Sequence, residues 1–295
     1  MRIYEIATNG VLLTQENLDF IKSFHNLPLM KISFDGLGYH DWLRNQKGAE
    51  KQAIESIKLC IKNDFKVKVQ FNFNNKNLSC VNETLNYLDE LGVIETRLIK
   101  TTVTPRLEKQ NSDIAFTNKE FYDAGLDVID NYIKNDHKMT VTIWQNSVIN
   151  PSRKILRFMK TKSEPRFFSE NKILCNTIRG SVAIGPSGNI YPCMQMSGFC
   201  DSNNIYFGNV KKSNLKQFLQ DSNYMKTITK TVKDKCQECK ECKYLQYCCC
   251  GCPAFALDNG DFLGPDPTSC YFFKHNYIEK YKKVIASHEG WKTIL

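Results

Sequence analysis

The sequence lacks the features of a membrane or secreted protein. No apolar run approaches the roughly 18 to 20 residues that a membrane span requires. The first ten residues, MRIYEIATNG, place Glu5 and polar side chains where a secretory signal needs an apolar core. We therefore expect a cytoplasmic protein that does not associate with membranes. In that reducing compartment, clustered cysteines are metal ligands more often than disulfides.

Basic segments interleaved with aromatic residues, which would indicate nucleic-acid binding, are also missing. The formal net charge of +9 is spread through lysines, with a mild cluster at Lys226–Lys243. Thiolates bound to metal would offset part of this charge. A solvated surface explains the remainder better than attraction of an acidic peptide does. We expect no nucleic-acid partner.

The composition is that of a folded protein with an unusual share of cysteine. Of 295 residues, 42% are hydrophobic and 12% aromatic, which is enough for a normal core. The length favours two domains. Thirteen cysteines are present, and all except Cys60 and Cys80 follow residue 170. Cys60 lies beside the apolar stripe of a predicted helix, so we expect it to be a buried structural thiol.

The first 145 residues alternate short apolar segments with amphipathic ones. Strands are predicted at 3–8, 29–34, 66–75, 96–102 and 139–144, and helices at 14–24, 49–63, 79–91 and 118–135. Thr14 and Ser79 are predicted to cap helices, and Gly92 to end one. Successive strand–helix units predict a parallel sheet with sites at the carboxyl ends of its strands.

The strand at 66–75 is the most informative. Its apolar residues alternate with polar ones that include Gln70 and Asn72. A parallel strand buried on both faces would be apolar throughout. The alternation therefore indicates either a strand whose polar face lines the lumen of a βα barrel or an exposed edge strand.

From about Phe167 the sequence changes to short strands, turns and cysteines. Residues 182–185 and 189–191 are predicted to form a hairpin that leads to Cys193. A short helix is predicted at 215–221 and a terminal helix at 271–287. Residues 150–166 form the predicted linker before this region.

The cysteines follow a fixed spacing. It reads Cys175-x12-Gly188-x4-Cys193, then Cys239-x2-Cys242-x5-Cys248-x3-Cys252, then Cys270. Thiolates select zinc or iron–sulfur clusters. Structural zinc typically uses two CxxC pairs, and no clean second pair is present. Four thiols complete a [4Fe–4S] cluster, so seven or eight indicate two clusters rather than zinc.

This pattern resembles the seven-cysteine signature of the SPASM domain, the C-terminal extension of radical S-adenosylmethionine (SAM) enzymes that modify peptides and proteins. The segment Phe207–Val210, FGNV, is typical of that family. Upstream, Thr8-Asn9-Gly10 and the segment from Ile32 to Arg44 resemble strand ends of the radical SAM barrel. The resemblance implies an α/β fold: a partial (β/α) barrel at 1–149 that lacks its first strands, the linker at 150–166, and a cysteine-rich α+β SPASM domain with a C-terminal helix at 167–295.

The resemblance also implies ligands by position. The first auxiliary [4Fe–4S] cluster is assigned Cys175, Cys193 and Cys252, and the second is assigned Cys239, Cys242, Cys248 and Cys270. The fourth ligand of the first cluster is Cys200, Cys236 or, if the iron stays open, a substrate thiol. Cys249 and Cys250 receive no role, although Cys250 stands where the family often has glycine. Ser33 is the candidate contact to the ribose of SAM, with Asp35 behind it; both are alternatively ordinary strand-end residues.

The sequence departs from the family at the motif that cleaves SAM. CxxxCxxC occurs nowhere in it, and the GGE-type segment that binds the methionine amino group is also absent. We expect an N-terminally truncated fragment, one piece of a split enzyme, or a non-catalytic member that binds peptide or relays electrons. SAM and a third [4Fe–4S] cluster become cofactors only if the missing N-terminal part is supplied.

A further departure bears on the reaction. Sulfatase-maturing relatives carry an aspartate directly after the cysteine that matches Cys193, where it accepts a proton. Met194 occupies that position here. The resemblance therefore favours a maturase that forms thioether or other radical cross-links in a ribosomal peptide, served by an external electron donor. A zinc-binding interaction domain is the remaining alternative.

Overall fold

The computed structural model describes residues 3–101, 112–161, 165–176, 182–212, 214 and 223–294. They form two compact units: residues 3–101, 112–159 and 278–294 make the first, and residues 160–277 make the second. The helix predicted at 215–221 lies outside the described residues. Within the described ranges, no helix combines the length and the apolar character needed to cross a membrane.

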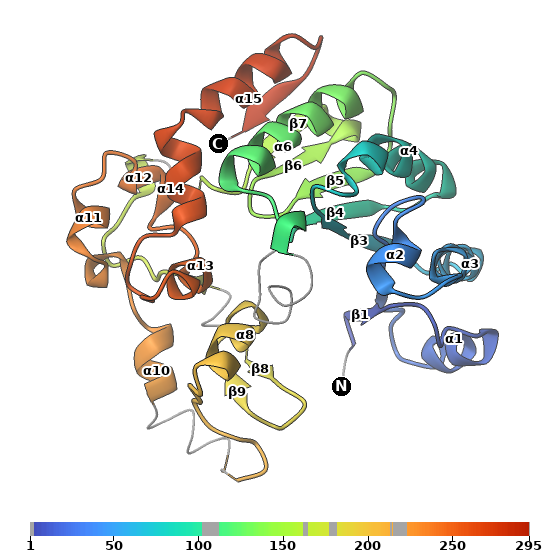
Figure 1. Cartoon of the computed structure of the whole chain (residues 1–295), viewed down its shortest axis with the longest axis horizontal. Helices are drawn as coiled ribbons and strands as arrows, with labels where there is room; N and C mark the ends of the chain where they lie inside the picture. The colour runs from blue at the N-terminus through green and yellow to red at the C-terminus, as the bar shows by residue number, and fades with distance from the viewer. Residues whose placement is uncertain are drawn as a thin grey trace. The chain divides into compact units, whose positions relative to one another are not determined.

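The first unit is built on one eight-stranded sheet, shown in Figure 1, with the order β1-β2-β3-β4-β5-β6-β7-β10. Its strands are β1 (Glu5–Thr8), β2 (Leu29–Ser33), β3 (Val67–Phe73), β4 (Glu95–Lys100), β5 (Thr140–Ile143), β6 (Ser147–Asn150), β7 (Ile155–Phe158) and β10 (Lys292–Ile294). Its α-helices are α1 (Gln15–Lys22), α2 (His40–Arg44), α3 (Ala49–Lys62), α4 (Val81–Leu91), α6 (Asn118–Ile133) and α15 (Tyr277–Ala286). Short 3-10 turns are η1 (Leu78–Cys80), η2 (Ser112–Ile114) and η3 (Pro151–Arg153).

The sheet is mixed. Strands β1 to β5 pair in parallel, as the alternation of strands and helices predicted. Strand β6 is antiparallel to both β5 and β7, and β10 joins β7 in parallel. Only residues 144–146 connect β5 to β6, which is too short for the crossover that a parallel pair needs. The predicted α/β class is confirmed, whereas the parallel arrangement holds only for the first five strands.

Strand β3 lies inside the sheet, between β2 and β4. Its apolar residues are fully buried, and its polar residues Lys68, Gln70 and Asn72 are partly exposed. The edge-strand interpretation of residues 66–75 was therefore wrong. The polar face belongs to a central strand, because the neighbours on both sides satisfy its backbone hydrogen bonds.

Two of the three predicted helix caps are present in the structure. The Thr14 side chain accepts a hydrogen bond from Asn17 N and forms a capping box, and Gly92 ends α4 with a φ of 89°. Both predictions are confirmed. Ser79 does not cap α4: the turn η1 comes first, and Cys80 holds the N-cap position without a side-chain bond. Cys60 is fully buried, as expected, and burial raises its pKa to about 11.

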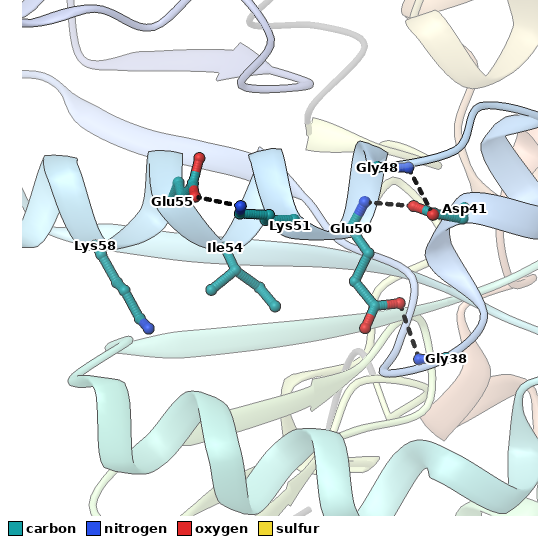
Figure 2. Close-up of a pocket in the computed structure, with 8 residues that line it drawn as sticks. All are labelled: Gly38, Asp41, Gly48, Glu50, Lys51, Ile54, Glu55 and Lys58. Atoms are coloured by element: carbon teal, nitrogen blue, oxygen red, sulfur yellow. Dashed lines mark hydrogen bonds and ion pairs between the residues drawn. The ribbon is translucent and has the colours of Figure 1, made fainter.

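Helix α3 takes its cap from outside the helix. Gly48 holds the N-cap position with a φ of 84° and has no side chain to offer. Asp41 of α2 supplies the acceptor instead: its oxygens lie 2.7 Å from Gly48 N and 2.6 Å from Glu50 N (Figure 2). These backbone donors lower the pKa of Asp41. Glu50 in turn accepts a hydrogen bond from Gly38 N, which ties the loop after β2 to α3.

The second unit contains short elements. Its strands are β8 (Ala183–Ile184) and β9 (Ile190–Tyr191). Its α-helices are α8 (Met194–Ser202), α10 (Asn223–Ile228), α11 (Gln237–Lys240), α12 (Leu245–Cys248), α13 (Pro253–Asp258) and α14 (Pro267–Lys274), and its 3-10 turns are η4 (Pro165–Phe167) and η5 (Val232–Asp234). The antiparallel pairing of β8 with β9 confirms the predicted hairpin.

Two segments differ from their predicted roles. The helix expected at 271–287 is divided into α14 and α15, because Asn276 adopts a left-handed φ of 58° between them. From residue 278 onward the chain, including β10, belongs to the first unit. Residues 150–166, expected to be a linker, contain β7, which pairs with β6 and β10.

Tyr281 is a buried contact between α15 and the rest of the first unit. Tyr281 is fully buried, and its hydroxyl donates to the carbonyl of Tyr122 at 3.0 Å. Asn146 Nδ2 donates to the same hydroxyl at 2.5 Å. Helix α6 makes room with Gly125, where a Cβ atom would lie 2.5 Å from the Tyr281 oxygen.

We expect Gly125→Ala to lower the free energy of unfolding by about 1–3 kcal/mol, the usual cost of overpacking a core. The added methyl group would displace the Tyr281 hydroxyl from its two partners. Urea denaturation followed by circular dichroism measures the effect. In a Tyr281→Phe background the same change should cost less, because the clashing oxygen is gone. Equal costs in the two backgrounds would contradict this packing.

Candidate functional site

One group of cysteines surrounds a hydrophobic cluster of the second unit. Cys175, Cys193 and Cys252 pack against this cluster, and Cys193 lies close enough to the other two to interact electrostatically. Cys193 and Cys252 are the N-cap residues of α8 and α13. Three thiols that are far apart in the sequence are therefore brought together, as the predicted first ligand set requires.

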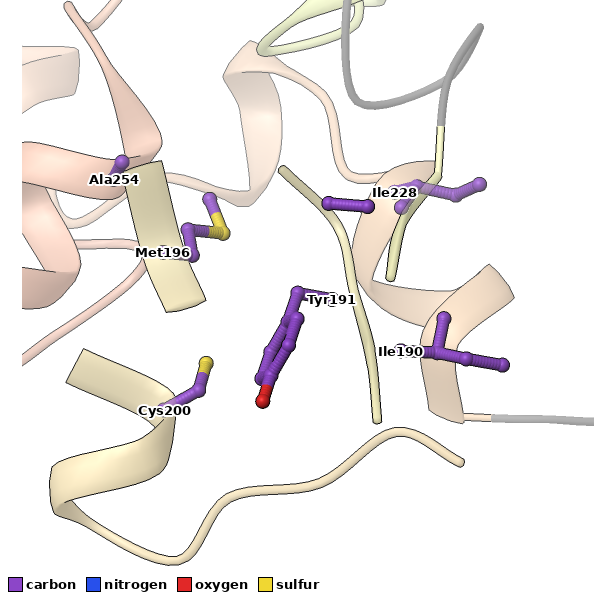
Figure 3. Packing of buried hydrophobic residues seen from close by; sticks show 7 residues of the cluster. Ile190, Tyr191, Met196, Cys200, Ile228 and Ala254 are labelled. Carbon is purple, nitrogen blue, oxygen red and sulfur yellow. The ribbon is translucent and has the colours of Figure 1, made fainter. Parts of the chain in front are cut away.

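Cys200 belongs to the same group. It is a fully buried member of the cluster, and Figure 3 shows it beside Tyr191, near Met196 of the same helix α8. Burial, followed by the negative charges of Asp201 and Cys193, raises its pKa to about 11. Cys236 lies in a different cluster, which also contains Cys239.

Gly188 shapes the hairpin that precedes Cys193. Its φ is 90°, and a Cβ atom would lie 3.0 Å from Asn209 Oδ1. Asn209 Nδ2 donates to the Ser187 carbonyl at 3.2 Å and to Asn189 Oδ1 at 2.8 Å. Gly188 of the cysteine pattern therefore contacts Asn209 of the FGNV segment. Glycine is required because only it combines this backbone with so close a neighbour.

A second group of cysteines lines a cavity of about 230 Å³. Five thiols face it: Cys239, Cys242, Cys248, Cys250 and Cys270. The first three come from α11, α12 and the turn between them, and Cys270 comes from α14. The four thiols predicted for the second cluster are thus at one cavity, together with one that was given no role.

Two thiols of this cavity have raised pKa values, which favour their protonated forms. A hydrogen bond with Cys250, followed by burial, raises the pKa of Cys239. Burial raises the pKa of Cys270 to about 11, although Lys274 opposes the shift. Metal binding would therefore release protons from both sulfurs.

Within the described residues, no three Cys, His, Asp or Glu side chains converge closely enough to hold one metal ion. The thiols of the second group lie around a cavity, and the four thiolates of a [4Fe–4S] cluster likewise surround a volume. None of the thirteen cysteines, all of which lie within the described residues, forms a disulfide.

Asp266 connects the two groups. Its side chain is 1% exposed and accepts hydrogen bonds from Cys252 N at 2.9 Å, Ser269 Oγ at 2.6 Å and Thr268 N at 2.9 Å. Lys160 Nζ, itself buried, lies 3.9 Å from the carboxylate. Burial alone would raise the pKa of Asp266, but Lys160 and these donors hold it below its usual value. Asp266 also caps α14, the helix of Cys270, so it fixes a member of each group.

A second buried lysine lies beside the cavity group. Lys235 is 2% exposed and donates to the carbonyls of Phe262, at 3.3 Å, and Gly264. Its positive charge reaches Cys236 and Cys239. The buried Lys235 thus places positive charge near thiols that become negative when they bind metal.

A polar face of the sheet is the third region that could form a functional site. Two rows of neighbouring residues cross β2, β3 and β4 on this face: Lys31, Lys68 and Glu95 in one, and Ser33, Gln70 and Arg97 in the other. Lys68 Nζ lies 2.6 Å from Glu95, and Arg97 stacks 4.4 Å over the ring of Trp144. Burial would raise the pKa of Glu95, but its bond to Lys68 brings it below the usual value.

Asp35 organises the end of β2. Its buried carboxylate accepts hydrogen bonds from Arg44 Nε at 2.8 Å and Asn72 N at 2.9 Å, and His40 Nδ1 lies 3.1 Å away. Asn77 Nδ2 donates to its carbonyl at 3.0 Å. The carboxylate is thus engaged by protein groups. Ser33 ends β2 and stays partly exposed on the polar face.

Several of these residues were not predicted from the sequence. Lys160 lies in the predicted linker, and Asp266 had no predicted role. The signal for Asp266 was present: aspartate followed by proline at 266–267 is an N-cap pattern, four residues before Cys270. Nothing in the sequence predicts that Lys160 reaches it, because the two are 106 positions apart.

Replacing Asp35 should destabilise the first unit. We expect Asp35→Ala to lower the free energy of unfolding by about 2–4 kcal/mol, because the Asn72 amide and the Arg44 guanidinium lose their acceptor. Ser33→Ala is the matched control and should change it by less than about 1 kcal/mol. Urea denaturation measures both changes in unfolding free energy. Similar losses in the two variants would contradict the proposed importance of the Asp35 hydrogen bonds.

Replacing Asp266 should leave the buried Lys160 charge without a partner. Asp266→Asn is expected to cost about 3–5 kcal/mol of unfolding free energy, measured by the same denaturation experiment. The double variant Lys160→Met with Asp266→Asn should recover part of this loss, because no buried charge remains. If the double variant loses as much unfolding free energy as the two single variants together, the unpaired Lys160 charge does not cause the loss.

Comparison with known proteins identifies one part of the chain directly. Residues 175–243 match SPASM, an iron–sulfur cluster-binding domain. The radical SAM cyclopropyl synthase TigE of Paramaledivibacter caminithermalis is 25% identical over 297 residues. That match covers 95% of this chain and 54% of TigE, so the chain spans about half the length of this relative.

Solved structures show the same fold. Native anSMEcpe with bound AdoMet superposes with a TM-score of 0.66 and 16% identity, over 98% of this chain and 76% of that one. Streptococcus suis SuiB bound to precursor peptide SuiA gives 0.61 and 12%, over 90% of this chain and 58% of SuiB. The matches give no support to the predicted N-terminal truncation. The chain thus contains a match to the SPASM domain, is similar in sequence to a radical SAM cyclopropyl synthase, and shares the fold of anSMEcpe and SuiB.

Proposed function

We propose that this chain is part of a radical SAM enzyme that modifies a peptide or protein, and that its second unit holds two auxiliary [4Fe–4S] clusters. The division of the thiols into two groups carries this proposal. Cys175, Cys193, Cys200 and Cys252 would hold one cluster, and Cys239, Cys242, Cys248 and Cys270 the other. Such clusters supply electron transfer when bound.

The place of Cys200 supports its choice as the fourth ligand of the first cluster. It is buried in the hydrophobic cluster around which the other three gather, and its thiol interacts with Cys193. Cys236 instead contacts Cys239. A complete set of four thiols removes the need for an open iron at this site.

The polar face of the sheet supports a site for SAM. Ser33 stands at the carboxyl end of β2, where ligands of parallel α/β sheets bind. We assign it the contact to the ribose. Asp35 acts behind it as a positioning residue, because its carboxylate is already engaged by Arg44 and Asn72.

The motif that cleaves SAM must come from elsewhere. This sequence contains no CxxxCxxC, so the third cluster requires a polypeptide segment outside it. We propose that another polypeptide segment supplies this motif and that an external protein donates electrons. The substrate is proposed to be a ribosomal peptide that receives a thioether or another cross-link. SuiB has been solved with a precursor peptide, which supports this class of substrate.

A non-catalytic module is the second candidate. The absence of CxxxCxxC favours it, since the thiol groups alone would suit peptide binding or electron relay. The two candidates differ in their genetic context. If neither the upstream DNA nor the neighbouring genes encode a CxxxCxxC segment, the enzyme proposal loses its support.

Metal analysis tests the clusters. We expect about eight iron and eight sulfide per chain after anaerobic purification, because each cluster contains four of each. Cys193→Ala and Cys242→Ala should each lower iron to about four, and Cys60→Ala, a buried thiol of the first unit, should leave it unchanged. Stoichiometric zinc without iron would instead establish a zinc-binding domain and end the proposal.

A further inference from the structure

The cavity of the second cysteine group has one thiol more than a cluster needs. A [4Fe–4S] cluster takes four sulfur ligands from the protein. Cys239, Cys242, Cys248 and Cys270 supply these four, and Cys250 lines the same cavity. Cys250 is outside the sequence pattern from which the other four were assigned.

Cys250 is placed beside one ligand in particular. Its side chain forms a hydrogen bond with the thiol of Cys239, so the two sulfurs are neighbours. Both residues are buried, with 4% and 8% of their surfaces exposed, and both belong to one hydrophobic cluster. An iron held by the Cys239 sulfur would therefore have a second sulfur within reach.

The backbone around Cys250 is unusual. Cys249, Cys250 and Gly251 have φ values of 44°, 65° and 68°, a left-handed run that favours glycine. Gly251 is required there, because a Cβ atom would lie 2.5 Å from Asp266 Cβ. A glycine at position 250 would adopt the same backbone without strain. Strained residues concentrate at functional sites, which indicates a use for the Cys250 side chain.

We propose that Cys250 is an alternative ligand for the iron assigned to Cys239, so that either thiol completes the second cluster. In the exchange, the Cys250 sulfur loses its proton and binds iron, and the Cys239 sulfur is released and takes up a proton. No electron is transferred. The inference rests on the proposed function, since it requires a cluster in this cavity.

Two nearby cysteines serve as controls. Cys249 precedes Cys250, is 1% exposed and belongs to the same hydrophobic cluster, but it is not among the residues that line the cavity. Cys242 lines the cavity as an assigned ligand. Cys249 therefore controls for the loss of a buried thiol, and Cys242 for the loss of a ligand without a substitute.

The test compares iron and sulfide in anaerobically reconstituted full-length variants. We expect about eight iron atoms in wild type, Cys250→Ala, Cys239→Ala and the double variant Cys239→Ala/Cys249→Ala. Cys242→Ala and the double variant Cys239→Ala/Cys250→Ala should keep about four. Those four belong to the first cluster and show that the second unit is still folded. Electron paramagnetic resonance of the reduced proteins should show a shifted second-cluster signal in Cys239→Ala.

Each outcome bears on one hypothesis. If Cys239→Ala falls to about four iron atoms, as Cys242→Ala does, Cys250 is not a substitute ligand, and the two-cluster proposal still stands. If Cys239→Ala/Cys250→Ala keeps about eight, some other group holds the iron, and the inference is again overturned. Wild-type protein without iron would instead refute the proposed function.

Discussion

The buried Asp266 carboxylate is the interaction on which the second unit depends. It accepts from the backbone of Cys252, caps the helix that carries Cys270, and lies beside the Lys160 ammonium. Removing a carboxylate from water is costly unless hydrogen bonds and an opposite charge replace the lost solvation. Here both are present. Because its partners belong to both thiol groups, one side chain sets the place of two candidate clusters.

A buried aspartate has the corresponding role in the sheet unit. Asp35 joins the end of β2 to α2 through Arg44, and to β3 through the Asn72 amide. This arrangement orders the carboxyl end of the parallel strands, where polar residues collect on one face. Ser33 is left partly exposed beside it. Asp35, predicted to lie behind Ser33 at a cofactor site, is engaged by protein groups and acts as a structural residue.

The chemistry proposed for the chain follows from the different roles of the two units. Protein groups fix the thiols in two sets, and the buried Lys235 supplies positive charge near one of them. The sequence contains no motif for cleaving SAM. The matches to SPASM and to TigE agree with this picture, and TigE is about twice as long as the stretch that aligns. A fifth thiol at one cavity adds a feature that the family pattern does not require.

The sequence by itself determined the local elements and the spacing of the cysteines. Alternation in β3, the Thr14 capping box and the Gly92 terminus each depend on neighbouring residues, so they were predictable. Only the tertiary structure decided that β6 runs antiparallel to its neighbours and that α15 packs in the first unit through Tyr281. It also decided that Lys160 pairs with Asp266 and that Cys239 contacts Cys250. Such contacts join residues far apart in the chain or depend on a strained backbone, and packing selects them only when the whole unit folds.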